Sequence, residues 1–234
     1  MDNIIQIRDL TFAYAAGDEP VLSDINIDIS SGEFVIIMGS SGSGKTTLLK
    51  MLKRNMIPAG RYSGRVYIYG KEADKLTDRE NAAGIGYVSQ DPDNQIVTDK
   101  VWHELAFGLE NLGMDNVTIR KKVAEMSEYF GITGWYDREV SKLSGGQKQI
   151  LNLASVMVMQ PGILLLDEPT ANLDPLAAIR FLDVVKRINQ ELGVTVVMVE
   201  HNLEHIYADA DRIIAIDKGR VAANSSPKKA AADI

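Results

Sequence analysis

The chain lacks several features, and each absence excludes a class of protein. Its 234 residues include no cysteine, which excludes disulfides and thiolate metal sites. No apolar run approaches the roughly 18 residues of a membrane span, and the N-terminus carries no signal-peptide pattern. The net charge of −7, from 32 acidic and 25 basic residues, argues against nucleic acid as the main partner. We therefore expect a soluble, cytoplasmic chain that reaches a membrane only through a partner.

The sequence does contain a glycine-rich turn placed between an apolar run and a helical stretch. The run at 34–38 precedes Gly39-Ser40-Ser41-Gly42-Ser43-Gly44-Lys45-Thr46-Thr47. All fixed positions of G-x-x-x-x-G-K-[ST] are filled, in the strand–turn–helix order of a phosphate-binding loop. The glycines let backbone N–H groups approach a polyphosphate, Lys45 would reach its β- and γ-phosphates, and the Thr46 hydroxyl would bind Mg²⁺. We predict that this loop binds a nucleoside triphosphate.

Two acidic residues follow another apolar run. Residues 162–166 predict a buried strand, and Asp167 and Glu168 come directly after it. P-loop enzymes use an acid at the end of such a strand for a second contact to Mg²⁺, which we assign to Asp167. Glu168 is predicted to be the general base or the group that orients water for attack on the γ-phosphate. Four apolar residues before this pair disfavour the alternative that both acids are surface charge.

The periodicity of the remaining sequence predicts an α/β domain with two sheets. Alternating apolar residues predict an antiparallel sheet near the N-terminus, at 5–14, 25–29 and 66–69. Continuous apolar runs predict a second, mostly parallel sheet, at 34–38, 84–89, 162–166, 194–199 and 213–216. Helical patterns occur at 100–112, 117–130, 143–159 and from Asp174-Pro175 onward, where an N-cap precedes a proline. We expect one domain over 1–234, with a helical lobe at about 91–160 and a flexible tail at 222–234.

One pentapeptide indicates a known family. Leu143-Ser144-Gly145-Gly146-Gln147 resembles the signature sequence of ATP-binding-cassette (ABC) ATPases, and the likeness covers essentially the entire chain. The resemblance implies a P-loop ABC ATPase fold with a mixed core sheet, an N-terminal antiparallel β subdomain and an α-helical signature subdomain. It implies ATP and Mg²⁺ as ligands. It also implies that two cassettes pair head to tail, each signature loop covering the ATP of the other.

The same resemblance implies roles for individual residues. Gln90 matches the family's Q-loop glutamine, Asn172-Leu173-Asp174 its D-loop, and His201 its switch histidine. Tyr14 stands where the family places an aromatic residue that stacks on adenine. The resemblance implies Glu168, His201 and Gln90 as catalytic residues. It implies a metal site made of Thr46, Gln90 and Asp167. The residues implied to contact the nucleotide are Tyr14, residues 39–47 and Ser144, Gly145, Gly146 and Gln147.

Two of these residues could instead have a purely structural role. Tyr14 also fits a strand aromatic that only packs, and Gln90 a polar residue that only ends a strand. His201 and His205 stand at i and i+4, a spacing used by metal pairs, but the glutamate and third ligand of a zinc site are missing. A histidine at a strand end beside a nucleotide explains His201 better.

The segment after Gln90 narrows the resemblance. Residues 91–97 and 105–113 look like the Q-loop and following helix of ATPases from energy-coupling-factor (ECF) and cobalt-type importers. This implies an ATPase that powers import of a vitamin or metal ion, bound at the cytoplasmic face of the membrane to a transmembrane coupling subunit. Asp91, Asp93 and Glu104 are candidates for contacts with arginines of that subunit. A general ABC transporter ATPase of another substrate class, or a soluble non-transport ABC ATPase, is the alternative.

Two features depart from the family pattern. Ile150 stands where an arginine commonly follows the signature, and the chain ends soon after the last predicted strand. Stand-alone ECF ATPases usually carry a C-terminal helical extension, so we expect a truncated chain or one half of a two-cassette polypeptide. The second cassette is then an identical chain, a related one or a fused one. A DNA-maintenance ATPase is disfavoured, because the segment from Thr47 to Lys142 has no room for a long coiled coil.

Overall fold

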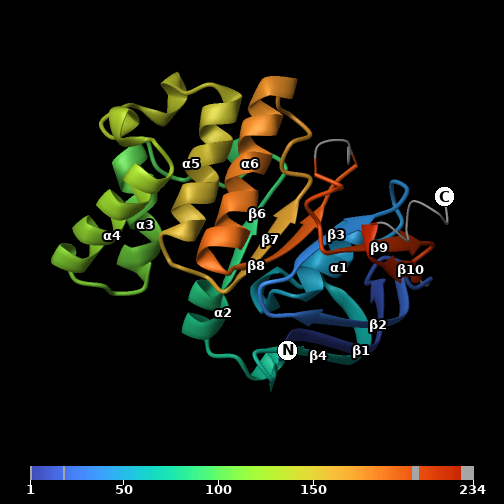
Figure 1. Cartoon of the computed structure of the whole chain (residues 1–234). Coiled ribbons are helices and arrows are strands. Elements are labelled where there is room, and N and C mark those ends of the chain that lie inside the picture. The colour runs from blue at the N-terminus through green and yellow to red at the C-terminus, as the bar shows by residue number, and fades with distance from the viewer. Residues whose placement is uncertain (1, 18, 202–205, 228–234) are drawn as a thin grey trace.

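Two β-sheets with helices on both sides of the larger one make up this computed structural model, which describes residues 2–17, 19–201 and 206–227 (Figure 1). The smaller sheet is antiparallel, in the order β2-β1-β4-β5. Its strands are β1 (Asn3–Tyr14), β2 (Leu22–Ser30), β4 (Gly60–Ile68) and β5 (Lys71–Glu72). The prediction of an antiparallel sheet near the N-terminus is confirmed.

The larger sheet has the order β10-β9-β3-β8-β7-β6 and is parallel except for β10. Its strands are β3 (Phe34–Met38), β6 (Ile85–Val88), β7 (Ile163–Asp167), β8 (Thr195–Val199), β9 (Arg212–Asp217) and β10 (Arg220–Ser225). The mixed α/β fold with a mixed core sheet is therefore confirmed. The expected tail is wrong for residues 222–225, which pair with β9 through their backbones; their small and polar side chains hid the strand. Residues 228–234 lie outside the described residues.

Six α-helices occur among the described residues: α1 (Lys45–Met51), α2 (Asp78–Gly84), α3 (Val101–Asn111), α4 (Asn116–Tyr129), α5 (Gly145–Met157) and α6 (Pro175–Leu192). Asp174 is the N-cap of α6 and accepts the Ala177 N–H, as the Asp-Pro pair predicts. Single 3-10 turns lie at Arg54–Met56, Ala73–Lys75, Pro92–Asn94, Thr133–Trp135 and Val140–Lys142. None of the described helices is long and apolar enough to cross a membrane.

The strands β3, β6, β7 and β8 of the larger sheet are buried on both faces, which explains their mostly apolar sequences. Along β3, Phe34 and Ile36 pack into the core shared with α3, α5 and α6. Val35 and Ile37 point the other way, into a second core with α1 and the antiparallel sheet. Figure 1 shows α1 between the two sheets and α5 and α6 on the opposite face.

This arrangement brings several loops to one edge of the molecule. The carboxyl ends of neighbouring parallel strands lie side by side, and β3, β8, β7 and β6 are consecutive neighbours. The glycine-rich loop follows β3, residues 200–201 follow β8, Asp167 ends β7 and Glu168 follows it, and residues 89–90 follow β6. Ligands of open α/β sheets bind at such an edge.

Candidate functional site

The glycine-rich loop has a conformation that only glycine permits at two positions. Gly39 has φ +150°, and a Cβ there would lie 2.1 Å from the Ile216 carbonyl oxygen. Gly44 has φ +105°, and a Cβ there would lie 2.9 Å from the Val21 carbonyl oxygen. The loop therefore wraps tightly between β3 and α1, so its backbone can approach a ligand closely.

The Lys45 side chain is held across this loop. It is 4% exposed, and its Nζ donates to the carbonyl oxygens of Gly39 and Ser40, each at 2.9 Å. The ammonium is thus fixed at the concave side of the loop, where it can neutralise an anion. The Ser43 hydroxyl is also buried and has no hydrogen-bond partner among the described residues.

Thr46 and Asp167 form the next pair. The Thr46 hydroxyl donates to Asp167 Oδ1 at 2.8 Å, and the Tyr87 hydroxyl donates to Asp167 Oδ2 at 2.8 Å. Burial, followed by the charge of Asp167, raises the pKa of Tyr87 well above its usual range, so its phenol stays a donor. The pair offers the hard oxygen ligands that Mg²⁺ prefers. No group of three or more His, Asp or Glu side chains able to hold a metal occurs in the described part of the chain.

Glu168 and His201 lie together at the ends of β7 and β8. His201 Nε2 is 3.0 Å from Glu168 Oε1, and the Glu168 backbone N–H donates to the Val199 carbonyl at 2.9 Å. Glu168 has φ +47°, a left-handed conformation that is strained for a residue with a side chain. Strained backbone conformations of this kind cluster at active sites and ligand-binding sites. His205, the second member of the histidine pair, lies outside the described residues.

Gln90 and Tyr14 border the same edge. Gln90 is exposed just after β6, and its carbonyl oxygen accepts the Asn172 Nδ2 at 3.4 Å. The Tyr14 hydroxyl is 2.8 Å from Thr47 Oγ1, and the ring, 38% exposed, packs edge-on against Phe12. The structure therefore brings the predicted strand aromatic against the start of α1.

The signature residues lie apart from this group, at the start of α5. The Ser144 hydroxyl accepts the Gln147 N–H at 3.3 Å, and Gln147 Oε1 accepts the Ser144 N–H at 3.0 Å, a capping box. Ser144 and Gly145 are exposed. Ser144, Gly146 and Gln147 line a hollow of about 440 Å³, together with the α6 N-cap Asp174 and Arg180 of α6. Among the described residues, no hydrogen bond or ion pair joins residues 144–147 to the glycine-rich loop.

The three candidate acids for partner contacts are all engaged within the chain. Glu104 is 5% exposed and accepts the N–H groups of Val97 and Thr98 at 3.1 and 2.9 Å. Asp93 pairs with Lys148 at 2.6 Å. Asp91 caps the 3-10 turn Pro92–Asn94. Glu104 is therefore a loop anchor rather than a surface charge.

Sequence reasoning missed several polar residues of the site. Tyr87 was part of an apolar strand pattern, and nothing marked its contact to Asp167. The Glu200 carboxylate is buried and accepts the Thr170 hydroxyl at 2.7 Å and the His201 N–H at 2.9 Å. Gln149 of α5 is buried and donates to two carbonyls near Gln90 and Glu168. A polar residue on the buried face of an amphipathic helix was the available signal for Gln149.

Comparison with known proteins gives a consistent result. Residues 22–171 match the ABC transporter family. A putative ABC transporter ATP-binding protein of Bacillus cereus is 46% identical over 98% of this chain and 41% of its own length. The energy-coupling factor transporter ATP-binding protein EcfA1 of Caldanaerobacter subterraneus is 39% identical over 97% of this chain and 82% of its own length. The chain spans about two-fifths of the length of several curated relatives that it matches.

Solved structures agree with this assignment. One is cbiO1 from Clostridium perfringens, described as part of the ABC transporter complex cbiONQ. It superposes with a TM-score of 0.90 at 32% sequence identity, and the alignment covers 100% of this chain and 92% of the cbiO1 chain. The dimeric cassette MJ0796 in a post-hydrolysis state, bound to ADP and Pi, has a TM-score of 0.81 and 28% identity and covers 95% and 98% of the two chains. The chain therefore belongs to the ABC transporter family, and its relatives include ATP-binding proteins of the energy-coupling-factor and cbiO types.

Proposed function

We propose that the chain hydrolyses ATP as the cassette of an importer for a vitamin or a metal ion, bound through a transmembrane partner at the cytoplasmic face of the membrane. The observation that carries the proposal is the Glu168–His201 pair beside the Thr46–Asp167 pair and Lys45, all at one edge of the larger sheet. The ECF and cbiO relatives support the importer class. The alternative is a non-transport ABC ATPase or a transporter of another substrate class.

The residues divide the work on ATP between binding and hydrolysis. Residues 39–47 bind the phosphates through backbone N–H groups and Lys45, and the half-exposed Tyr14 ring stacks on adenine. Thr46, Asp167 and Gln90 would hold Mg²⁺, which when bound neutralises charge on the β- and γ-phosphates. Glu168 orients the attacking water and accepts its proton, while His201, whose Nε2 lies 3.0 Å from Glu168 Oε1, holds the carboxylate in place.

A second cassette completes the site. At the start of α5, a helix of 13 residues, Ser144 and Gly145 are exposed and Gly146 is half-buried, and no hydrogen bond among the described residues joins them to their own phosphate loop. We propose that the donors of these residues and Gln147 act on the γ-phosphate of ATP held by a partner cassette in a head-to-tail pair. ATP then favours the closed pair of cassettes over the open pair, so ATP binding shifts the two cassettes toward each other. The dimeric MJ0796 structure supports this arrangement.

Mixing two inactive variants tests the head-to-tail pair. Lys45→Ala removes the phosphate-loop cation, and Ser144→Arg blocks the signature donors, so each variant alone should lack ATPase activity. In a mixed dimer, one site combines the intact Lys45 of one chain with the intact Ser144 of the other. A 1:1 mixture should therefore recover up to about a quarter of the wild-type ATPase rate, since half the dimers are mixed and carry one intact site of two. A mixture as inactive as its components contradicts action in trans.

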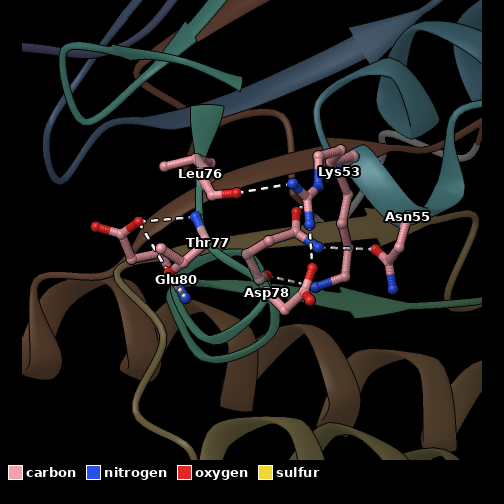
Figure 2. A network of polar contacts seen from close by, with 8 residues as sticks. Lys53, Asn55, Leu76, Thr77, Asp78 and Glu80 are labelled. Atoms are coloured by element: carbon pink, nitrogen blue, oxygen red, sulfur yellow. Dashed lines mark hydrogen bonds and ion pairs between the residues drawn. The ribbon is translucent and has the colours of Figure 1, made fainter. Parts of the chain in front are cut away.

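The membrane partner has a candidate docking place. A groove of about 560 Å³ lies between α2, α3 and α5, with Val97, Phe107 and Met159 on its walls. Lys53 lies at its base, where Nζ donates to the Asn81 carbonyl at 3.0 Å and to the Ile85 carbonyl. Burial lowers the pKa of Lys53 to about 8. Figure 2 shows Lys53, Asn55 and Asp78 beside the start of α2. Lys53 and Asn55 both bond Asn81, and Asp78 bonds Arg54, so these contacts link the segment after α1 to α2.

Substitutions in the groove test the docking. Phe107 is a partly exposed apolar residue of the groove, and Phe107→Glu should prevent capture of the chain with detergent-solubilised membranes of its native cells, because a charge opposes apolar contact. The matched control is Val117→Glu, which places the same charge on an exposed apolar residue of α4 outside the groove. Equal capture of both variants and wild type argues for another docking surface. A chain that hydrolyses ATP but never sediments with membranes supports the non-transport alternative.

A further inference from the structure

Gln149 joins three segments of the chain that the proposed function uses separately. It is 0% exposed on α5, the helix that begins with the signature residues. Its Nε2 donates to the Ser89 carbonyl at 3.0 Å and to the Pro169 carbonyl at 2.9 Å. Ser89 immediately precedes Gln90, and Pro169 immediately follows Glu168. One amide group thus ties the signature helix to the neighbours of two predicted catalytic residues.

We infer that Gln149 is a positioning residue that transmits the position of the signature helix to Gln90 and Glu168 of the same chain. This rests on the proposed function, in which the start of α5 contacts ATP held by the partner cassette. Gln149 lies one helical turn beyond Gly145, so a shift at the start of α5 moves its amide. The nucleotide bound at one site of the pair then adjusts hydrolysis at the other site.

A second buried amide of α5 reinforces the connection. Asn152 Nδ2 donates to Gln95 Oε1 at 3.2 Å. Gln95 in turn accepts the Ser89 N–H at 2.9 Å and donates to the Tyr87 carbonyl at 2.8 Å. Asn152 follows Gln149 by three residues and lies on the same face of the helix. The segment from Tyr87 to Gln95 is therefore fixed to α5 at two successive points.

The hydrogen bonds of Gln149 indicate a role beyond packing in the core. Its Oε1 is buried and has no hydrogen-bond partner among the described residues. Burying a polar atom without a partner is unfavourable, and an apolar side chain of similar size would avoid it. The two bonds from Nε2 are what the glutamine contributes here. Both acceptors are backbone atoms in segments that lead directly to the reacting groups, so the bonds fix where Gln90 and Glu168 point.

The chain offers a matched control for this amide. Asn189 of α6 also uses its Nδ2 to hold two backbone carbonyls, of Gly32 at 2.8 Å and of Val194 at 2.9 Å. Its partners adjoin none of the predicted catalytic residues. Gln149→Met and Asn189→Leu both delete an amide of this kind, and only the first breaks the connection to Gln90 and Glu168.

Steady-state kinetics of the 234-residue chain test the inference. In Gln149→Met, kcat for ATP should fall at least about 10-fold, since a displacement near 1 Å misaligns the reacting groups, while KM for ATP should stay within about three-fold because the phosphate loop is untouched. Asn189→Leu should keep both constants close to wild type. A wild-type kcat in Gln149→Met, or a KM that rises in step with the loss of kcat, overturns the inference. Gln149→Glu, which keeps the side-chain shape but presents oxygen to both carbonyls, gives the same comparison if the methionine variant does not fold.

A Glu168→Gln arm separates this inference from the proposed function. If Glu168→Gln still turns over ATP, the hydrolytic role that the proposed function assigns to Glu168 fails, and the inference fails with it. If Glu168→Gln is inactive and the Gln149 variants remain active, the inference alone fails. Hydrogen exchange supplies a measurement independent of these variants' folding. Adding ATP to wild type should alter exchange at residues 145–149, 89–91 and 168–170 together. A change confined to residues 145–149 overturns the coupling.

Discussion

Replacement of Glu168 by glutamine is expected to lower the ATP turnover number by at least about 100-fold, the usual contribution of a general base. In the wild type, Glu168 Oε1 lies 3.0 Å from His201 Nε2. The amide keeps the shape of the side chain and should keep this contact. It cannot accept a proton from water at neutral pH. ATP affinity should stay within about three-fold of wild type, because Lys45 and the glycine-rich loop are unchanged.

The variant should also accumulate as an ATP-bound dimer, since ATP that closes the pair is no longer consumed. Phosphate release under saturating ATP measures turnover, and size-exclusion chromatography with and without ATP measures pairing. Glu125→Gln, an exposed position on α4, is the control for loss of one negative charge. Normal turnover in Glu168→Gln rejects the role assigned to this carboxylate, whatever happens to the dimer.

Replacement of Lys45 by alanine is expected to abolish ATP binding at working concentrations. The ammonium contacts the Gly39 and Ser40 carbonyls at 2.9 Å and is positioned to bond the β- and γ-phosphates. Bonds between a charged donor and a charged acceptor are worth about 1.5–3 kcal/mol each, so two of them correspond to a loss in affinity of at least about 100-fold.

Isothermal titration calorimetry with ATP and Mg²⁺ measures this loss of ATP affinity directly. Lys50→Ala, in the last turn of the same short helix α1, removes an equal charge outside the glycine-rich loop and should bind as wild type does. A melting temperature close to wild type in both variants excludes unfolding as the cause. Retained affinity in Lys45→Ala contradicts the assignment of the loop to phosphate binding.

Much of this site was predictable because its residues come in short contiguous runs. The spacing from Gly39 to Thr46, the pentapeptide at 143–147 and the acid pair after 162–166 are each local patterns with a local physical cause. The family followed from these patterns, the two sheets followed from the periodicity of the apolar residues, and both are confirmed. β10 was missed because its small and polar side chains carry no hydrophobic alternation, and only pairing with β9 makes it a strand.

The sequence pattern could predict neither the burial of single polar residues nor contacts between segments distant in sequence. Glu104 follows Thr98 by six residues and resembles a surface acid, yet packing of α3 buries it against the N–H groups of the preceding loop. Tyr87 and Asp167 are 80 residues apart, and only the pairing of β6 with β7 brings them together. A pattern along the chain cannot report such a contact, because it depends on strand order.

The sequence by itself determined which chemical groups we assign to ATP, since a phosphate loop and a strand-end acid need particular residues at fixed local spacing. The tertiary structure alone decided how those groups are held: Glu168 against His201, Thr46 against Asp167, and Gln149 across two carbonyls. The physical reason is that hydrogen bonds act over about 3 Å, and only the folded sheet and helices bring atoms from separate segments within that reach.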